Sequence, residues 1–265
     1  LGAILYAVAG ARRRVVLTNL RLCFPGLDDG QRRQLARAHF RAFARSLLEH
    51  GILWWGSKAE IEAMVRFEGI ENWLDIKDRP VILLAPHFIG LDTGGIRITC
   101  TGRRVDSVYS RQKSAAADAI FMHGRTRFGQ SVLFARQDGV RPMIRSLKSG
   151  IPVYYLPDMD LGARDSVFAP FFGVQTATIT GLSRIAALVG AVIVPCVTRQ
   201  LPGGAGYVAT FYPAWRDFPS GDFTVDAQRM NAFIEARARE MPEQYYWLHK
   251  RFKTRPAGEP NPYER

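Results

Sequence analysis

The sequence lacks paired cysteines and long apolar runs. Its three cysteines, Cys23, Cys100 and Cys196, are odd in number, far apart and without metal-ligand spacing. This pattern argues against a disulfide framework or a zinc site and favours reduced thiols. The sequence also lacks the roughly 18 to 20 consecutive apolar residues that a membrane-spanning helix needs. No repeat, low-complexity segment or domain linker interrupts the 265 residues, so a single globular enzyme is expected.

Acidic residues are also scarce. The chain has 36 Lys and Arg against 24 Asp and Glu, a formal net charge of +12. Such a charge favours anionic partners, which include nucleic acid, phospholipid headgroups and phosphorylated substrates. The positive charges are dispersed, and no zinc-finger, ribonucleoprotein or helix-turn-helix pattern is present. A basic protein that binds nucleic acid or membranes without catalysis therefore remains only as an alternative.

The amino-terminal residues resemble the end of a membrane helix. Residues 1–10 are almost wholly apolar and are followed at once by Arg12, Arg13 and Arg14. A basic flank of this kind is typical of the cytoplasmic end of a membrane helix. We therefore expect an anchor upstream of Leu1, with an ordinary amphipathic helix as the alternative.

A helix is predicted over residues 28–56. Apolar side chains recur there at three- and four-residue steps, and an aspartate at position 28 or 29 can cap the start. Trp54 and Trp55 at its end fit either core packing or a membrane interface. We expect residues 1–60 to form a helical, membrane-proximal segment.

Residues 61–265 predict one α/β domain with a mixed central sheet flanked by helices. Short apolar runs alternate there with helical stretches, and two of the runs are nearly continuous, as in strands covered on both faces. The expected strands are 81–85, 105–109, 151–156 and 192–197, with 207–212 as an edge strand; the expected helices are 115–128, 140–147 and 225–241.

The first predicted strand leads to a histidine and an aspartate. His87 follows the strand's carboxyl end, where active sites of α/β sheets lie, and Asp92 comes about one helical turn later. A carboxylate there can accept the proton on one imidazole nitrogen, leaving the other to take a proton from a substrate hydroxyl. The alternative is a buried structural histidine. Gly90, Gly94 and Gly95 would let a bulky lipid approach the backbone.

Several blocks in the right order resemble the lipid A biosynthesis lauroyl and myristoyl acyltransferases, within the glycerolipid and lysophospholipid acyltransferase superfamily. The blocks are Asn19–Pro25, His39-Phe40 with Leu48-Glu49, the His87–Asp92 run, Pro157–Asp160 with Ser166–Gly173, and Pro242–Pro256. The resemblance implies a glycerol-3-phosphate acyltransferase-like fold, with His87 as general base and Asp92 orienting it. Many lauroyl-type members carry Glu where this chain has Asp92, which leaves acyl-chain length open.

Acyl transfer also needs a positive group near the developing oxyanion. Arg111 is the first candidate, because Tyr109-Ser110-Arg111 resembles the family's Tyr-Arg element with one inserted residue. Arg125 and Arg127 are candidates for binding the acceptor's phosphates through bidentate contacts. A solvated basic surface is the alternative for all three.

Two further groups of residues are candidates for substrate binding. Asp158 and Asp160 follow the third buried strand, and Arg251 belongs to the basic and aromatic carboxyl-terminal block, in which His249 is expected to be structural. Two aspartates without a nearby histidine supply too few ligands for a metal, so no metal site is predicted.

The resemblance implies acyl transfer from a thioester, on acyl carrier protein or coenzyme A, to a hydroxyl of a lipid A precursor. No further cofactor is expected. Neither a Gly-x-Ser-x-Gly elbow nor a Cys–His motif is present, so direct transfer is predicted. The expected partners are acyl carrier protein, whose acidic surface suits this basic one, an anionic lipid acceptor and the cytoplasmic surface of the bacterial inner membrane, but not nucleic acid. A lysophospholipid, an aminolipid or a phosphatidylinositol mannoside is the alternative acceptor.

Overall fold

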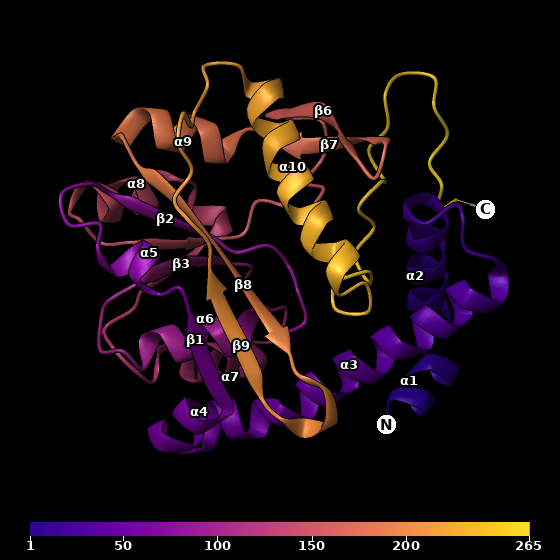
Figure 1. Ribbon diagram of the computed structural model, residues 1–265, viewed down its shortest axis with the longest axis horizontal. Helices are drawn as coiled ribbons and strands as arrows, with labels where there is room; N and C mark the ends of the chain where they lie inside the picture. The colour runs from indigo at the N-terminus through magenta and orange to yellow at the C-terminus, as the bar shows by residue number, and fades with distance from the viewer. Residues whose placement is uncertain (265) are drawn as a thin grey trace. The chain divides into compact units, whose positions relative to one another are not determined.

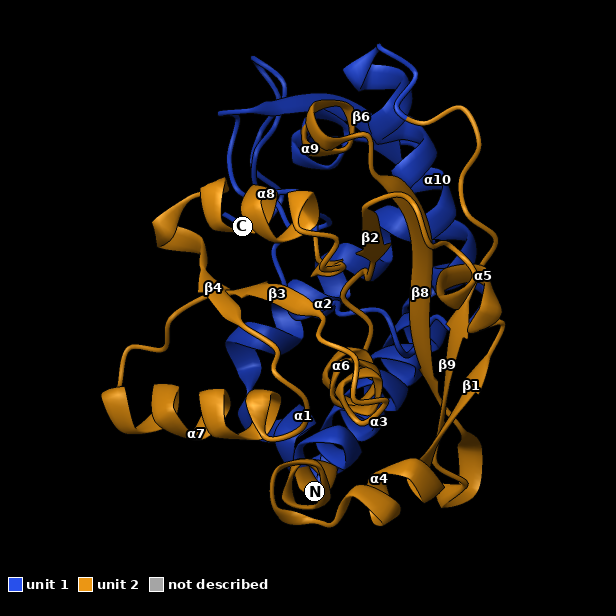
Figure 2. Cartoon of the chain, turned by 90° about the vertical axis from the view of Figure 1, so that its left-hand side faces the viewer, with its two compact units in different colours: residues 1–47, 157–184, 219–265 blue, residues 48–156, 185–218 orange. Residues whose placement is uncertain are grey.

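A computed structural model describes residues 1–264 of the chain. Figure 1 labels the helices and strands of these residues, and the chain divides into two compact units, which Figure 2 colours separately. Unit 1 comprises residues 1–47, 157–184 and 219–265, and unit 2 comprises residues 48–156 and 185–218. The division into 1–60 and 61–265 stays a prediction.

Unit 2 contains the central sheet. Among the described residues this sheet has seven strands in the order β1-β9-β8-β2-β5-β3-β4. The neighbours β8 and β9 are antiparallel and the other neighbouring pairs are parallel. The predicted α/β fold with a mixed central sheet is therefore confirmed. The strands are β1 (Val65–Glu68), β2 (Val81–Leu84), β3 (Asp106–Tyr109), β4 (Leu133–Ala135), β5 (Val153–Tyr155), β8 (Val192–Gln200) and β9 (Tyr207–Phe211).

One strand prediction was wrong in its position. Residues 207–212 were expected at the edge of the sheet, but β9 lies between β8 and β1. Strand β1 was not predicted, because its four residues alternate between buried and more exposed positions and are too few to give a clear pattern. β9 is accordingly buried along most of its length.

Helices cover both faces of this sheet. Asp106 of β3 accepts a hydrogen bond of 2.7 Å from Ser146 of α8, whereas its neighbour Ser107 lines a cavity together with residues of α6. Because successive strand residues point to opposite faces, α6 and α8 cover opposite sides. The unit 2 helices are α4 (Lys58–Met64), α5 (Glu71–Leu74), α6 (Leu91–Thr99), α7 (Ala115–Thr126) and α8 (Arg141–Lys148), with short 3₁₀ turns at Arg136–Asp138 and Pro202–Gly204.

Unit 1 combines helices with a two-stranded hairpin. β6 (Ser166–Phe171) and β7 (Val174–Ile179) are antiparallel, and the two residues between them, Phe172 and Gly173, both have positive φ. This is the backbone that a tight type I′ hairpin turn requires. The hairpin packs against α10 (Phe223–Glu240). The other unit 1 helices are α1 (Gly2–Val8) and α2 (Gly10–Cys23).

Two helices contribute residues to both units. α3 (Asp29–Trp55) confirms the helix predicted over residues 28–56, and Asp28 caps it by accepting a 2.8 Å hydrogen bond from the Gln31 amide. The last residues of α3, from position 48, belong to unit 2. α9 (Gly181–Val189) begins in unit 1 and ends in unit 2.

Candidate active site

His87 lies in the loop between β2 and α6. All four residues of β2 are buried, as expected of a strand covered on both faces. Phe88 and Ile89 after the histidine are also buried, at 3% and 7% exposure, and anchor the loop. His87 itself is half-buried. The strand therefore delivers this side chain to the carboxyl edge of the parallel strands β8, β2 and β5.

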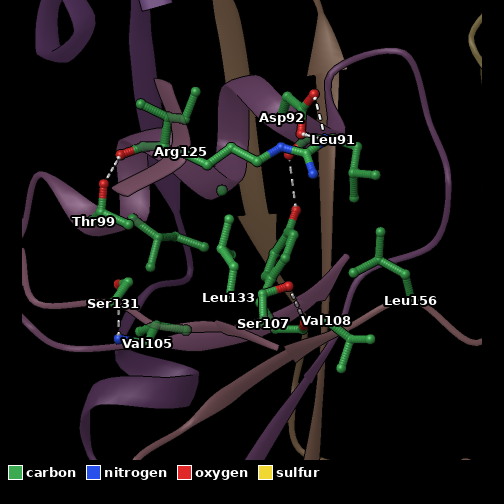
Figure 3. A pocket seen from close by; sticks show the side chains of 14 residues that line it. Leu91, Asp92, Thr99, Val105, Ser107, Val108, Arg125, Ser131, Leu133 and Leu156 are labelled. Carbon is green, nitrogen blue, oxygen red and sulfur yellow. Dashed lines mark hydrogen bonds and ion pairs between the residues drawn. The ribbon is translucent and has the colours of Figure 1, made fainter. Parts of the chain in front are cut away.

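Asp92 occupies the first turn of α6 and is held by two basic side chains. Arg125 of α7 places Nη2 2.8 Å from Oδ1 and 3.0 Å from Oδ2 of Asp92 (Figure 3). His50 of α3 places Nε2 3.3 Å from Oδ2 of the same carboxylate. The three side chains belong to unit 2, so α3, α6 and α7 together fix the orientation of Asp92.

The contacts of Asp92 also control its charge. Burial raises the pKa of this carboxyl, but the Arg125 guanidinium and His50 together outweigh burial and hold the pKa well below its usual range. Asp92 therefore stays ionised at any pH near neutrality. An ionised carboxylate can orient an imidazole or stabilise an imidazolium, but it cannot supply a proton to the reaction.

Sequence reasoning missed His50. It lies one helical turn before Trp54, and the two rings pack edge to face with centroids 4.8 Å apart. Trp54 also contacts Phe121 of α7, at 5.0 Å between centroids. Core packing and a membrane interface were the alternatives for the two tryptophans. Trp54 packs inside unit 2, whereas Trp55 is 62% exposed. The four-residue spacing of His50 and Trp54 was the available signal, since it places both on one helix face.

The glycines around Asp92 serve packing. A Cβ on Gly94 would lie 1.9 Å from Oγ1 of Thr198, and one on Gly90 would lie 2.6 Å from the carbonyl oxygen of Thr198. Strand β8 thus occupies the space that we expected to be open to lipid. Gly95 differs, because a Cβ added there would lie 3.5 Å from the ring of Tyr154, which is an ordinary van der Waals contact.

A cavity adjoins Asp92 inside unit 2. Its walls come from α6, β3, β4 and β5, and Arg125 and Asp92 lie at one end while Val105 and Ser131 lie at the other (Figure 3). Tyr154 of β5 also lines the cavity and donates a 3.1 Å hydrogen bond to the carbonyl oxygen of Leu91. Most of the other lining side chains are aliphatic: Leu91, Ile96, Ile98, Val108, Leu133 and Leu156.

Arg111 follows β3, as predicted, and lies in an exposed loop. Its Nη2 is 3.3 Å from Oδ1 of Asp138, and 56% of its side chain is exposed. Arg125, not Arg111, is the arginine that lines the cavity at Asp92. The role of Arg111 in stabilising an oxyanion stays a prediction.

Arg125 and Arg127 both have partners within unit 2. Arg125 binds Asp92, whereas Arg127 donates hydrogen bonds to the carbonyl oxygens of Leu53, at 3.2 Å, and Gly56, at 2.6 Å. Arg127 therefore caps the carboxyl end of α3. Phosphate binding by either arginine remains a prediction, and it would have to share or replace these contacts.

The three predicted binding residues in unit 1 are almost wholly buried. Asp158, Asp160 and Arg251 are 1%, 1% and 2% exposed. Asp160 accepts hydrogen bonds of 2.8 Å from the amide and hydroxyl of Thr254, and its own amide donates to Nε2 of His249 at 3.0 Å.

Asp158 and Arg251 have equally specific partners. The Tyr245 hydroxyl donates to Asp158 at 3.3 Å, and Arg251 Nη1 donates to the Ala177 carbonyl oxygen at 2.9 Å. These contacts hold the carboxyl-terminal segment to the rest of unit 1. Substrate binding by the three residues stays a prediction. Because their side chains are buried, we expect them to affect binding indirectly, through the packing of unit 1.

The cysteines are poor nucleophiles. Cys23, Cys100 and Cys196 are free and buried, and burial raises the pKa of each thiol. The nucleophilic thiolate is therefore disfavoured at all three positions. Within residues 1–264 no group of three or more His, Cys, Asp or Glu is arranged to hold a metal ion. Nor does that range contain a helix with the length and apolar character needed to cross a membrane.

Comparison with known proteins identifies relatives along nearly the whole chain. Residues 1–254 match the family described as bacterial lipid A biosynthesis acyltransferase. The lipid A biosynthesis lauroyltransferase of Escherichia coli K12 is 36% identical over 95% of this chain and 82% of its own length. The myristoyltransferase of the same organism is 31% identical over 96% of this chain and 79% of its own length.

A more distant similarity links the chain to a solved structure. The crystal structure of a 1-acyl-sn-glycerophosphate acyltransferase from Thermotoga maritima covers 86% of this chain and 97% of its own, at 15% sequence identity. The TM-score is 0.41. This value is too low to support any argument about the site.

Proposed function

The chain belongs to the family of bacterial lipid A biosynthesis acyltransferases and is an O-acyltransferase, and on this premise we propose that it acylates a hydroxyl of a lipid A precursor from an acyl carrier protein thioester. The observation that carries the proposal is the ionised carboxylate of Asp92, which Arg125 and His50 hold in place directly after the His87 loop. An anion fixed in the first turn of α6, five residues after a histidine at a strand end, is what we propose for general-base catalysis.

In the proposed reaction His87 takes the proton of the acceptor hydroxyl. The hydroxyl oxygen attacks the thioester carbonyl carbon, a new ester bond forms, and the carbon–sulfur bond breaks. The leaving thiolate recovers the proton, so the carrier is released as a free thiol. Asp92 orients the imidazole and stabilises its positive charge, while His50 and Arg125 keep Asp92 ionised and in place. Arg111 would stabilise the oxyanion.

We assign the cavity beside Asp92 to the acyl chain, which would have to widen it beyond its volume of about 60 Å³. Its walls are mostly aliphatic, and its polar end is formed by Asp92 and Arg125. A hydrocarbon chain gains free energy when it leaves water for such a surface. Placing the polar end at Asp92 would bring the thioester carbonyl near the reacting groups.

The proposal includes the cytoplasmic surface of the inner membrane as the site of action. The unit 2 end of α3 exposes Leu48, Ile52 and Trp55, by 67%, 42% and 62%, at steps that place them on one helix face. In unit 1, α1 exposes Ile4 and Val8 by 62% and 72%. Exposed apolar side chains with a net charge of +12 favour the surface of an anionic membrane. An upstream anchor would strengthen this attachment.

The decisive test is mass spectrometry of a lipid A precursor incubated with acyl carrier protein thioester. We expect one added acyl group with the unaltered chain and none with His87→Ala. His123→Ala is the matched control, because His123 is an exposed histidine of unit 2. Parallel reactions replace the donor by acyl coenzyme A and the acceptor by a lysophospholipid. Acylation of the lysophospholipid alone would refute the lipid A precursor as the acceptor. Full activity of His87→Ala would refute His87 as the general base.

A further inference from the structure

Unit 2 has a second and much larger cavity, at the opposite end of the sheet from His87. It lies among the loops that precede β2, β5 and β3, three strands that are neighbours in the sheet. The amino ends of parallel strands meet at one edge, so the loops form one wall. The cavity volume is about 580 Å³, within the range of small-molecule sites.

The cavity is rich in positive charge. Five basic side chains line it, against a single carboxylate, Asp78; they are Lys77, Arg79, Arg103, Arg104 and Lys148. Arg104 is neutralised by Asp106, whose oxygens lie 2.9 and 3.0 Å from its guanidinium. Arg79 donates only to a carbonyl oxygen, that of Gly190, at 3.2 Å. Within residues 1–264 neither Arg103 nor Lys148 forms an ion pair, and both are exposed to solvent.

Part of the wall of this cavity is apolar. Trp73, Val81 and Leu147 are 2%, 4% and 0% exposed and also line the cavity. Cations gathered in a concave site repel one another, and the low-dielectric wall weakens the screening by water. A bound anion would relieve this repulsion. The arrangement therefore favours a ligand with several negative charges.

The chemistry of the cations narrows the ligand further. Arginine presents donors in a planar fork that matches phosphate oxygens, and lysine adds a point charge. Here the cations come from two loops, at residues 77–79 and 103–104, and from Lys148 at the carboxyl end of α8. Cations that approach from several sides suit a ligand with two linked phosphates better than one small anion.

We propose that this cavity binds an anion bearing two or more phosphate groups, either soluble or displayed at a lipid surface. It is distinct from the reaction site. Val81, at the cavity, begins β2, and Leu84, on the way to His87, ends it, so roughly 10 Å of extended strand separates the two ends. An occupant would leave the Asp92 cavity free and contact the strand that carries the His87 loop.

The test measures binding of inorganic pyrophosphate to the full chain by isothermal titration calorimetry. We expect saturable binding that weakens with added salt. The double variant Arg103→Gln/Lys148→Gln should bind about a hundredfold more weakly, because each of the two lost charge-assisted hydrogen bonds costs about a factor of ten. The control Arg141→Gln/Arg145→Gln removes two exposed cations of α8 that do not line the cavity. It should bind within about twofold of the unaltered chain.

A second arm separates the two sources of phosphate. Co-sedimentation with vesicles of cardiolipin, whose headgroup carries two linked phosphates, and phosphatidylcholine is compared for the same variants. Loss of both pyrophosphate and vesicle binding in Arg103→Gln/Lys148→Gln would identify a lipid headgroup as the source. Loss of pyrophosphate binding alone would identify a soluble ligand. No saturable binding at millimolar pyrophosphate, or equal weakening in the control pair, would overturn the proposal.

Discussion

His50 Nε2 lies 3.3 Å from Oδ2 of Asp92 and joins α3 to the first turn of α6. The contact brings together two residues that are 42 positions apart in the chain. We regard His50 as a positioning residue, which acts on the reaction through Asp92.

His50 can be tested by two substitutions. His50→Ala removes the donor, and we expect kcat to fall about tenfold while KM changes little, because the acceptor's binding groups are untouched. His50→Gln retains an amide donor on a similar reach and should recover part of kcat. Steady-state kinetics on both variants is the measurement. A loss confined to KM, or no recovery in His50→Gln, would exclude positioning of Asp92.

Arg125 should keep Asp92 ionised as the pH falls. Asp92 has a depressed pKa in the folded protein, so it loses its charge only at a pH well below the ordinary carboxyl range. Arg125→Gln removes the guanidinium while burial remains, and the pKa of Asp92 should rise. We expect the acid limb of the kcat/KM profile to become steeper, because Asp92 would then have to lose a proton in addition to the general base His87. Asp138→Asn, which frees Arg111, is the control and should leave that limb in place.

Cavity length should govern the acyl chain. Leu133→Trp fills space between the polar end and the Val105 end, so transfer of long chains should fall and that of shorter chains should persist. The measurement is competition between acyl carrier protein thioesters of different length. Leu74→Trp, at a half-buried leucine that does not line this cavity, is the control. An unchanged length preference in Leu133→Trp would contradict the assignment.

Gly94 should be intolerant of any side chain. Its Cβ would lie 1.9 Å from Thr198 Oγ1, so Gly94→Ala should destabilise the fold by about 1–3 kcal/mol through overpacking. Gly95→Ala on the same helix has no such clash and should unfold near the original urea midpoint. Thr198→Ala removes the clashing hydroxyl and should recover part of the loss in the double variant. Additive effects of the two substitutions would show that the contact is absent.

His39 should make unit 1 sensitive to acid. Burial lowers the pKa of His39 to about 4, from 6.5, although a hydrogen bond to the Glu243 carbonyl oxygen opposes the shift. Below pH 6.5 His39 binds a proton in the unfolded chain, whereas in the folded protein it stays neutral until the pH approaches 4. Stability is therefore fully present above pH 6.5 and falls as the pH drops to about 4, by about 3 kcal/mol in all.

Urea unfolding at several pH values tests this prediction. His39→Gln keeps a donor for the Glu243 carbonyl oxygen but cannot titrate, so the slope between pH 6.5 and 4 should become shallower. His123→Gln removes an exposed histidine and should leave the slope as it was. The same slope in His39→Gln as in the unaltered chain would rule out this histidine as the cause.

The strands and helices with strong patterns could be predicted from local sequence. β2 was predictable because four consecutive buried residues leave an uninterrupted apolar run, and α3 because its apolar side chains recur at helical spacing. The position of His87 at a strand end and of Asp92 in the following helix depends on local chain geometry alone. These features were therefore visible without a structure.

The side chains that meet at Asp92 could not be predicted in this way. His50 and Arg125 come from helices far away in the chain, and no local pattern marks them as neighbours of one carboxylate. The same reason explains why Gly94 faces Thr198 and why β9 lies inside the sheet. Long-range packing sets such contacts, since a helix or strand specifies its own periodicity but not the element against which it will pack.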